Sequence, residues 1–407
     1  MAKMRKICFL FNHYFIHQVP HAAPYAFELS RNYPQFRCII ACSSTQELDY
    51  AKRIATLYPG QKCEFRLLSV PSYYRFIDPF ISRWAFYRKR LVLRNNLDFF
   101  RGIDVLVAPE RNCMQLKTRF GLKNLTMIHC RHGAGDRAGG FDKRLGMFDF
   151  ILLPGKKIED RLNELGFLRK GHYAVVGYPK FEVIIGLNKG RRPPRFFNNT
   201  NPTVVYNPHF DQKVASWNVM GLDVLDFFKE SRGFNLILSP HIVLFKRRLR
   251  HRAPKVPKDY FNLPNMLIDL DSPSLADMTY TLYSDIYLGD VSSQVYEFII
   301  KPRPCIFLNA HRIRWQDDPA YLHWKLGQVV ETVEEMAQAL RKAFSVQKNF
   351  EPIQRRLFSY TFYSEPGSTA AQRGARAIAE FIKKEIHRKM KAKNIIKDES
   401  HHQGISF

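Results

Sequence analysis

Long apolar runs are missing from this 407-residue sequence. No hydrophobic stretch approaches the ~20 residues that a membrane-spanning helix needs, so none is predicted. Near the start, the apolar residues 7–11 follow a basic head, but they are too few for the core of a signal peptide. We expect them to form the first buried strand of a globular protein.

Acidic residues and paired cysteines are also scarce. The chain has 37 Asp and Glu against 63 Lys and Arg, a net charge of +26, which favours an anionic partner such as a phosphorylated substrate, a phospholipid surface or nucleic acid. The seven cysteines are an odd number and lack metal-knuckle or redox spacing. Reduced, buried thiols in a cytoplasmic protein, without a metal site, are therefore expected. The GxGxxG, GxxxxGK[ST] and GxSxG motifs are absent as well.

Short apolar segments alternate with longer amphipathic ones through most of the chain. Strands are predicted in a first series at residues 7–11, 37–41, 65–70, 105–108, 126–129, 150–153 and 174–176, and in a second series at 203–206, 236–239, 266–270, 286–289, 305–308 and 328–330. Continuous apolar runs of this kind are typical of parallel strands buried on both faces. We predict an α/β protein with two Rossmann-like, doubly wound domains that face a central cleft.

A polar stretch rich in proline and asparagine separates the two series. The predicted parts are an N-terminal, acceptor-side domain (1–188) with a basic, aromatic insertion (73–100), a linker (189–202), a C-terminal, nucleotide-donor domain (203–365), a basic helix (366–393) and a disordered tail (394–407). The insertion contains Arg88, Lys89 and Arg90. It is either a helix packed on the first domain with a solvated basic face, or an amphipathic surface that meets the acceptor or an anionic membrane.

The strongest local signal is the segment 288–298, where a predicted strand runs into a helix. Asp290 or a serine can cap this helix, and its first N–H groups with the hydroxyls of Ser292 and Ser293 form a candidate phosphate site. Glu297, one turn further on, can accept a hydrogen bond from a ribose hydroxyl. The alternative is a capped structural helix without a ligand.

Three histidines follow predicted strands. His132 is followed by Gly133, which permits close approach of a ligand, and an imidazole titrates in the range that a general base requires. His209 and His241 each follow a proline in the second series. Together the three would surround one cleft, although each can instead be an ordinary turn residue.

Taken in order, segments from about residue 126 to 343 resemble the CDP-glycerol glycerophosphotransferase family, whose members build poly(glycerol phosphate) teichoic-acid chains. The similarity lies in His132-Gly133, in residues 176–179 (Val-Gly-Tyr-Pro), in residues 289–293 (Gly-Asp-Val-Ser-Ser) and in residues 301–304 (Lys-Pro-Arg-Pro). The sequence departs from the family at Arg131, where the family has Trp, and at Pro240-His241, where the family has His-Pro.

The resemblance implies the GT-B fold and a transferase that moves glycerol phosphate from a nucleotide-diphosphate donor to a hydroxyl of a phosphate-rich or lipid-linked acceptor. It implies His132 as the general base and His241 and Arg303 as groups that offset the leaving-group charge, with Asp290, Ser292, Ser293, Glu297, His209 and Gly133 at the donor. No cofactor, tightly bound metal or specific nucleic acid is expected, and the protein would be cytoplasmic, peripheral on the inner face of the membrane. Alternatives are a GT-B glycosyltransferase with a nucleotide-sugar donor for surface polysaccharide, a nucleotide-sugar epimerase, and a non-catalytic protein that binds RNA or membranes.

Overall fold

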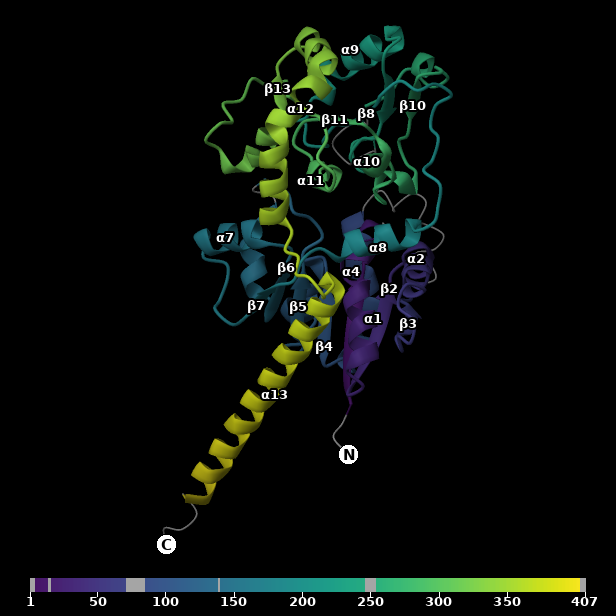
Figure 1. Ribbon diagram of the computed structural model, residues 1–407. Helices are drawn as coiled ribbons and strands as arrows, with labels where there is room; N and C mark the ends of the chain where they lie inside the picture. The colour runs from purple at the N-terminus through teal and green to yellow at the C-terminus, as the bar shows by residue number, and fades with distance from the viewer. Residues whose placement is uncertain (1–3, 14–15, 71–84, 138–139, 246–253, 403–407) are drawn as a thin grey trace.

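The computed structural model describes residues 4–13, 16–70, 85–137, 140–245 and 254–402. It contains two parallel β-sheets, each flanked by helices, in two domains that lie one above the other in Figure 1. The predicted fold class is confirmed. We call the domain built on β1–β7 the first domain and that built on β8–β13 the second domain.

The sheet of the first domain has the strand order β3-β2-β1-β4-β5-β6-β7, with all neighbours parallel. Its strands are β1 (Arg5–Phe11), β2 (Phe36–Cys42), β3 (Glu64–Leu67), β4 (Val105–Ala108), β5 (Thr126–Cys130), β6 (Phe150–Leu153) and β7 (Tyr173–Val175). The helices of this part of the chain are α1 (Ala23–Asn32), α2 (Thr45–Ala55), α4 (Ala85–Asn95), α5 (Leu97–Arg101), α6 (Gln115–Thr118), α7 (Lys156–Glu164) and α8 (Pro179–Asn188).

The sheet of the second domain repeats this arrangement as β10-β9-β8-β11-β12-β13, again all parallel. Its strands are β8 (Thr203–Asn207), β9 (Asn235–Leu238), β10 (Met266–Ile268), β11 (Ile286–Gly289), β12 (Cys305–Leu308) and β13 (Gln328–Val330). The helices are α9 (Trp217–Glu230), α10 (Thr279–Tyr283), α11 (Gln294–Phe298) and α12 (Val333–Thr361). Each of the 13 strands predicted from the sequence is confirmed, with lengths of three to seven residues, and the central strands are the buried apolar runs that mark strands covered on both faces.

The chain returns to the first domain at its C-terminal end. The end of α12 lies so close to the loop after β6 that a Cβ on Gly155 would be 2.2 Å from the main-chain oxygen of Thr361. Helix α13 (Ala370–His402) then packs against α1 and adds Ala371, Ala375, Ile378 and Ile382 to the core of the first domain. The far end of α13 extends beyond that domain (Figure 1).

Two expectations about these segments are wrong. Helix α13 continues to His402, whereas the sequence was expected to be disordered from residue 394. In the insertion, of which residues 73–84 lie outside the described residues, α4 turns Arg88 and Lys89 inward and leaves Arg90 exposed. Lys89 forms a buried ion pair with Glu110, at 2.7 Å, and Arg88 donates to the main-chain oxygen of Ser43. These two cations therefore do not form part of an exposed acceptor or membrane surface.

No helix in the described part of the chain is long and apolar enough to cross a membrane.

Candidate functional site

The carboxyl ends of the strands carry the candidate residues. In the first sheet His13 follows β1, Glu110 follows β4 and His132 follows β5. In the second sheet His209 follows β8, His241 follows β9 and the segment 290–293 follows β11. Strands β1 and β4, like β8 and β11, are neighbours at which the strand order reverses, and this is where open α/β sheets bind ligands.

His132 is held by the end of the neighbouring strand. Its Nδ1 lies 2.6 Å from the main-chain oxygen of Pro109. Because a carbonyl only accepts hydrogen bonds, Nδ1 carries the proton and Nε2 keeps its lone pair. The ring is accessible to solvent, yet protein atoms crowd it, and this desolvation lowers its pKa to about 4. His132 is therefore neutral near pH 7, with a basic nitrogen available.

His209 and His241 have the opposite tautomer. The main-chain N–H of Asp211 donates to Nδ1 of His209 at 3.1 Å, and that of Val243 donates to Nδ1 of His241 at 3.3 Å. In the neutral rings the proton is therefore on Nε2, which becomes a hydrogen-bond donor. Burial lowers the pKa of His209 to about 2, and the two rings lie 5.3 Å apart. The second domain thus presents two adjacent N–H donors.

Three further histidines lie beside His132 and were not identified from the sequence. His13, His17 and His21 come from the segment after β1, including the 3-10 helix η1 (Ile16–His21). The His17 ring is 5.9 Å and the His21 ring 6.4 Å from that of His132. Burial lowers the pKa of all three. The spacing of four residues directly after the first strand could have indicated this cluster. Among the described residues, no group of three or more His, Cys, Asp or Glu side chains is arranged to hold a metal ion.

Asp290 organises the loop after β11. Its buried carboxylate accepts hydrogen bonds from the main-chain N–H groups of His209, Ser216 and Val291 and from the Ser216 hydroxyl, at 2.6–3.1 Å. Burial raises the pKa of the Asp290 carboxyl, although these hydrogen bonds act in the opposite direction. These contacts fix the shape of the loop, as expected for Asp290. The carboxylate is too enclosed, however, to contact a nucleotide donor directly.

The two serines of this loop differ. Ser293 is exposed, whereas Ser292 is buried and accepts a 3.4 Å hydrogen bond from the main-chain N–H of Gln294. Helix α11 begins after them and is only five residues long. Of the predicted phosphate contacts, the hydroxyl of Ser293 is therefore the accessible one.

One loop of the first domain contacts the second domain near the residues described above. We call residues 131–137, which include His132 and Gly133, the bridging loop. A Cβ on Gly135 would lie 3.0 Å from Cβ of Ser293, so glycine permits this close contact. Arg137 donates to Asp211 at 2.9 Å and to Nδ1 of His209 at 3.4 Å. By contrast, a Cβ on Gly133 would meet no protein atom within 4 Å. The predicted histidine base therefore belongs to the segment that contacts the second domain.

Two predicted donor contacts need correction. Both oxygens of Glu297 accept from Lys180 of the first domain at 2.8 Å, and one accepts from the hydroxyl of Tyr178 at 3.0 Å. Glu297 thus forms a buried interdomain ion pair in place of the expected ribose contact. Arg303 precedes β12 and lies at the amino edge of the sheet, opposite the cleft side. There its guanidinium donates to the main-chain oxygens of Thr281, Leu282, Ser284 and Phe298, so it cannot offset leaving-group charge.

Comparison with solved structures agrees with this architecture. The wall teichoic acid polymerase TagF superimposes with a TM-score of 0.59 and 15% identity, covering 94% of this chain and 90% of that chain. A Listeria monocytogenes protein described as a UDP-N-acetylglucosamine 2-epimerase gives 0.61 and 13%, covering 95% and 98%. The UDP-GlcNAc 2-epimerase of Neisseria meningitidis, solved with UDP-GlcNAc, gives 0.53 and 13%, covering 93% and 100%. This chain has the GT-B fold.

At these identities the likeness extends to the fold and not to a particular activity. No family profile matches the sequence, and no curated protein is significantly similar to it. His132 lies in the first domain and the pair His209–His241 in the second, each after the carboxyl end of a strand.

Proposed function

We propose that this protein is a transferase that moves a group from a nucleotide-diphosphate donor to an acceptor hydroxyl, in the interdomain cleft. The observation that carries the proposal is the complementary protonation across the cleft. Nε2 of His132 has a lone pair, whereas Nε2 of His209 and of His241 bears a proton. A proton acceptor on one side and hydrogen-bond donors on the other suit the attack of a hydroxyl and the departure of a phosphate.

In the proposed reaction His132 acts on the acceptor. As the acceptor oxygen attacks, its proton passes to Nε2 of His132. With a CDP-glycerol donor the new bond forms to the phosphorus of the glycerol phosphate, the bond to the bridging oxygen breaks, and CMP leaves with its electrons. With a sugar donor the attack falls on the anomeric carbon and the nucleoside diphosphate leaves.

The donor phosphates would lie against the second domain. Nε2–H of His209 and of His241 and the exposed hydroxyl of Ser293 would contact the donor phosphates. These groups would stabilise the charge on the leaving phosphate mainly because they are already positioned to donate hydrogen bonds to it. As neutral imidazoles, the two histidines would do so without the desolvation cost of a cation. Gly133 would allow close approach of the transferred group.

CDP-glycerol is the first candidate donor, because the sequence resembles the CDP-glycerol glycerophosphotransferases and TagF shares the fold. A nucleotide sugar is the second candidate, and an epimerase acting on one is the alternative reaction, since two of the similar structures are described as UDP-GlcNAc 2-epimerases. The net charge of +26 supports a phosphate-rich or lipid-linked acceptor, with the protein peripheral on an anionic membrane.

The test is donor binding followed by product analysis on the full chain. We expect CDP-glycerol, or else a nucleotide sugar, to raise the melting temperature in a thermal-shift screen of nucleotide diphosphates and their conjugates. The selected donor should then release its nucleotide only when a hydroxyl acceptor is present. Conversion of a nucleotide sugar without an acceptor would favour the epimerase, and salt-sensitive RNA binding without any response to these donors would overturn the proposal.

A further inference from the structure

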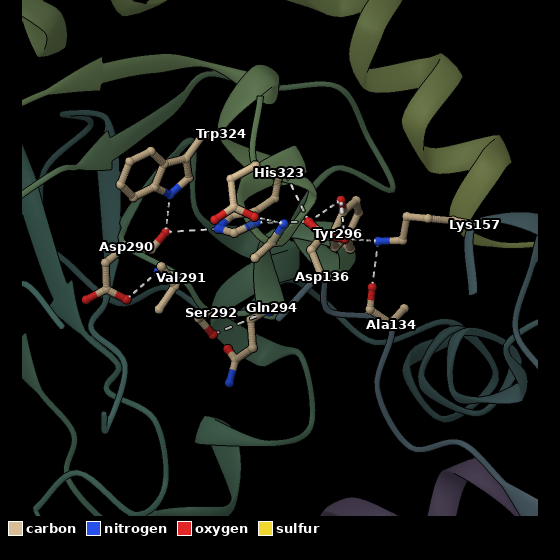
Figure 2. Close-up of polar contacts among 12 residues, drawn as sticks. Ala134, Asp136, Lys157, Asp290, Val291, Ser292, Gln294, Tyr296, His323 and Trp324 are labelled. Carbon is tan, nitrogen blue, oxygen red and sulfur yellow. Dashed lines mark hydrogen bonds and ion pairs between the residues drawn. The ribbon is translucent and has the colours of Figure 1, made fainter. Parts of the chain in front are cut away.

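Asp136 forms hydrogen bonds with both domains where they meet. It lies in the bridging loop, four residues after His132, and its carboxylate is buried. From the second domain it accepts hydrogen bonds from the hydroxyl of Tyr296, at 2.7 and 3.0 Å, and from the main-chain N–H of His323, at 3.0 Å. Figure 2 shows it between His323 and Lys157, next to Tyr296.

Lys157 holds the same loop from within the first domain. Its ammonium group lies 2.5 Å from Asp136 and 2.7 Å from the main-chain oxygen of Ala134. Burial disfavours the charged form of Asp136, but Lys157 and His323 outweigh it and hold its pKa at about 2. Asp136 is therefore a carboxylate at every pH at which the protein would work, and both domains bind it.

The imidazole of His323 links this carboxylate to the donor-side loop. Its Nδ1 is 2.9 Å from Asp136, and its Nε2 is 3.2 Å from the main-chain oxygen of Asp290, which also accepts from the indole of Trp324 at 2.6 Å. The ring therefore bridges the carboxylate of Asp136 in the first domain and the main chain at Asp290 in the second domain.

We propose that Asp136 and His323 are positioning residues that couple the bridging loop, and with it His132, to the donor-side loop at Asp290, so that domain closure and placement of the base are one event. This inference rests on the proposed function for its catalytic meaning. The coupling itself depends only on the contacts described above, so it can be measured without an enzyme assay.

The readout is the reactivity of His132 toward diethyl pyrocarbonate, which modifies the unprotonated imidazole nitrogen and is measured by peptide mass spectrometry on the full chain. In Asp136→Asn the amide cannot accept from both domains as the carboxylate does, and the loop is released. We expect His132 to be modified several-fold faster than in the wild type. Tyr296→Phe, which removes one of the contacts, should have a smaller effect in the same direction.

Two substitutions of His323 separate its contacts. The amide nitrogen of Asn lies near the position of Nδ1, and that of Gln near the position of Nε2. His323→Asn therefore keeps a side-chain donor toward Asp136, whereas His323→Gln keeps one toward Asp290 and loses the side-chain contact to Asp136, with the main-chain N–H contact to Asp136 present in both. We expect fast modification of His132 in His323→Gln and a nearly wild-type rate in His323→Asn. This pair carries the test if Asp136→Asn does not fold.

Tyr360→Phe is the matched control. The Tyr360 hydroxyl, on α12, also donates to a carboxylate of the other domain, Asp160 at 2.9 Å, but away from the bridging loop. It should leave the modification of His132 unchanged. An unchanged rate in folded His323→Gln, or an equal rise in Tyr360→Phe, would overturn the inference.

A second arm measures turnover with the donor found by screening. We expect Asp136→Asn and His323→Gln to lower kcat by about 10²-fold, as a misplaced catalytic group does, with little change in the donor KM. If no donor is turned over but the modification of His132 changes as expected, the proposed function fails and the coupling remains. If turnover is intact in both variants, the positioning role fails and the proposed function remains.

Discussion

Nδ1 of His132 lies 2.6 Å from the main-chain oxygen of Pro109, the residue that follows β4. This contact fixes the ring's tautomer and its orientation with a main-chain group that cannot change its protonation state. The neighbouring strands β4 and β5 therefore define where the lone pair of Nε2 is presented. In the proposed reaction, this contact would fix the base in the orientation in which it takes the proton of the acceptor hydroxyl.

Replacement of this histidine should separate catalysis from binding. In His132→Asn we expect turnover to fall by about 10² to 10⁴, the usual contribution of a general base, with donor affinity unchanged in calorimetry. His172→Asn is the matched control, because its Nδ1 also contacts a main-chain oxygen, that of Asp149 at 2.9 Å, but at the amino edge of the sheet. Wild-type turnover in His132→Asn would remove this residue as the base.

The two serines before α11 should differ in their effect on the donor. Ser293 is exposed, and loss of a hydrogen bond to a charged phosphate is worth about 1.5–3 kcal/mol, so Ser293→Ala should weaken donor binding by about tenfold or more. Ser292 is buried within the turn, and Ser292→Ala should leave donor affinity within about twofold of the wild type. Calorimetry with the screened donor measures both, and a larger effect at Ser292 would contradict this arrangement.

Much of this arrangement follows from local sequence. The strands were predictable because continuous apolar runs of strand length allow few other structures, and the position of His132, His209 and His241 after the carboxyl ends of strands was predictable with them, whereas their role in a site stays a prediction. The partners of Asp136 were not, because His323 lies 187 residues away in the sequence and meets it only when two domains close. Glu297 and Arg303 were misassigned for a related reason. A charged residue near a predicted phosphate site has the same local pattern whether it binds a ligand, an ion of the other domain or main-chain oxygens.

The ion pair between Lys180 and Glu297 should be structural. Both side chains are buried, so Lys180→Met leaves an uncompensated carboxylate and should lower the free energy of unfolding by about 3–5 kcal/mol. The double variant Lys180→Met/Glu297→Gln should recover part of this loss, because no buried charge is then left unpaired. Urea denaturation followed by circular dichroism measures both. If instead Glu297→Gln weakens donor binding and leaves stability unchanged, Glu297 holds the ribose after all.

Acidification should lower the free energy of unfolding already at pH values above those at which the carboxylates are protonated. The imidazoles of His21 and His129 are buried, and burial lowers their pKa well below the usual value near 6.5. A histidine with a lowered pKa binds its proton more readily in the unfolded chain, so the free energy of unfolding falls as the pH drops below about 6.5, and each such group contributes up to about 1.4 kcal/mol per pH unit. Melting temperatures between pH 7.5 and 4.5 test this. His129→Gln, which keeps a neutral side chain, should reduce the slope, and a stability that is flat over this range would contradict the neutral buried rings.

The exposed cations of α13 offer a test of membrane attachment. Lys383, Lys384 and Arg388 are exposed on α13. Each cation near an anionic surface contributes about 1 kcal/mol, so the triple change to Glu should lower binding to phosphatidylglycerol vesicles by at least 10²-fold in co-sedimentation. The matched control changes Arg341, Lys342 and Lys348, three exposed cations on α12 of the second domain, to Glu. Both triple variants alter the net charge by the same amount, so an equal loss in both would indicate attraction by overall charge, whereas a loss confined to the first would assign the contact to α13.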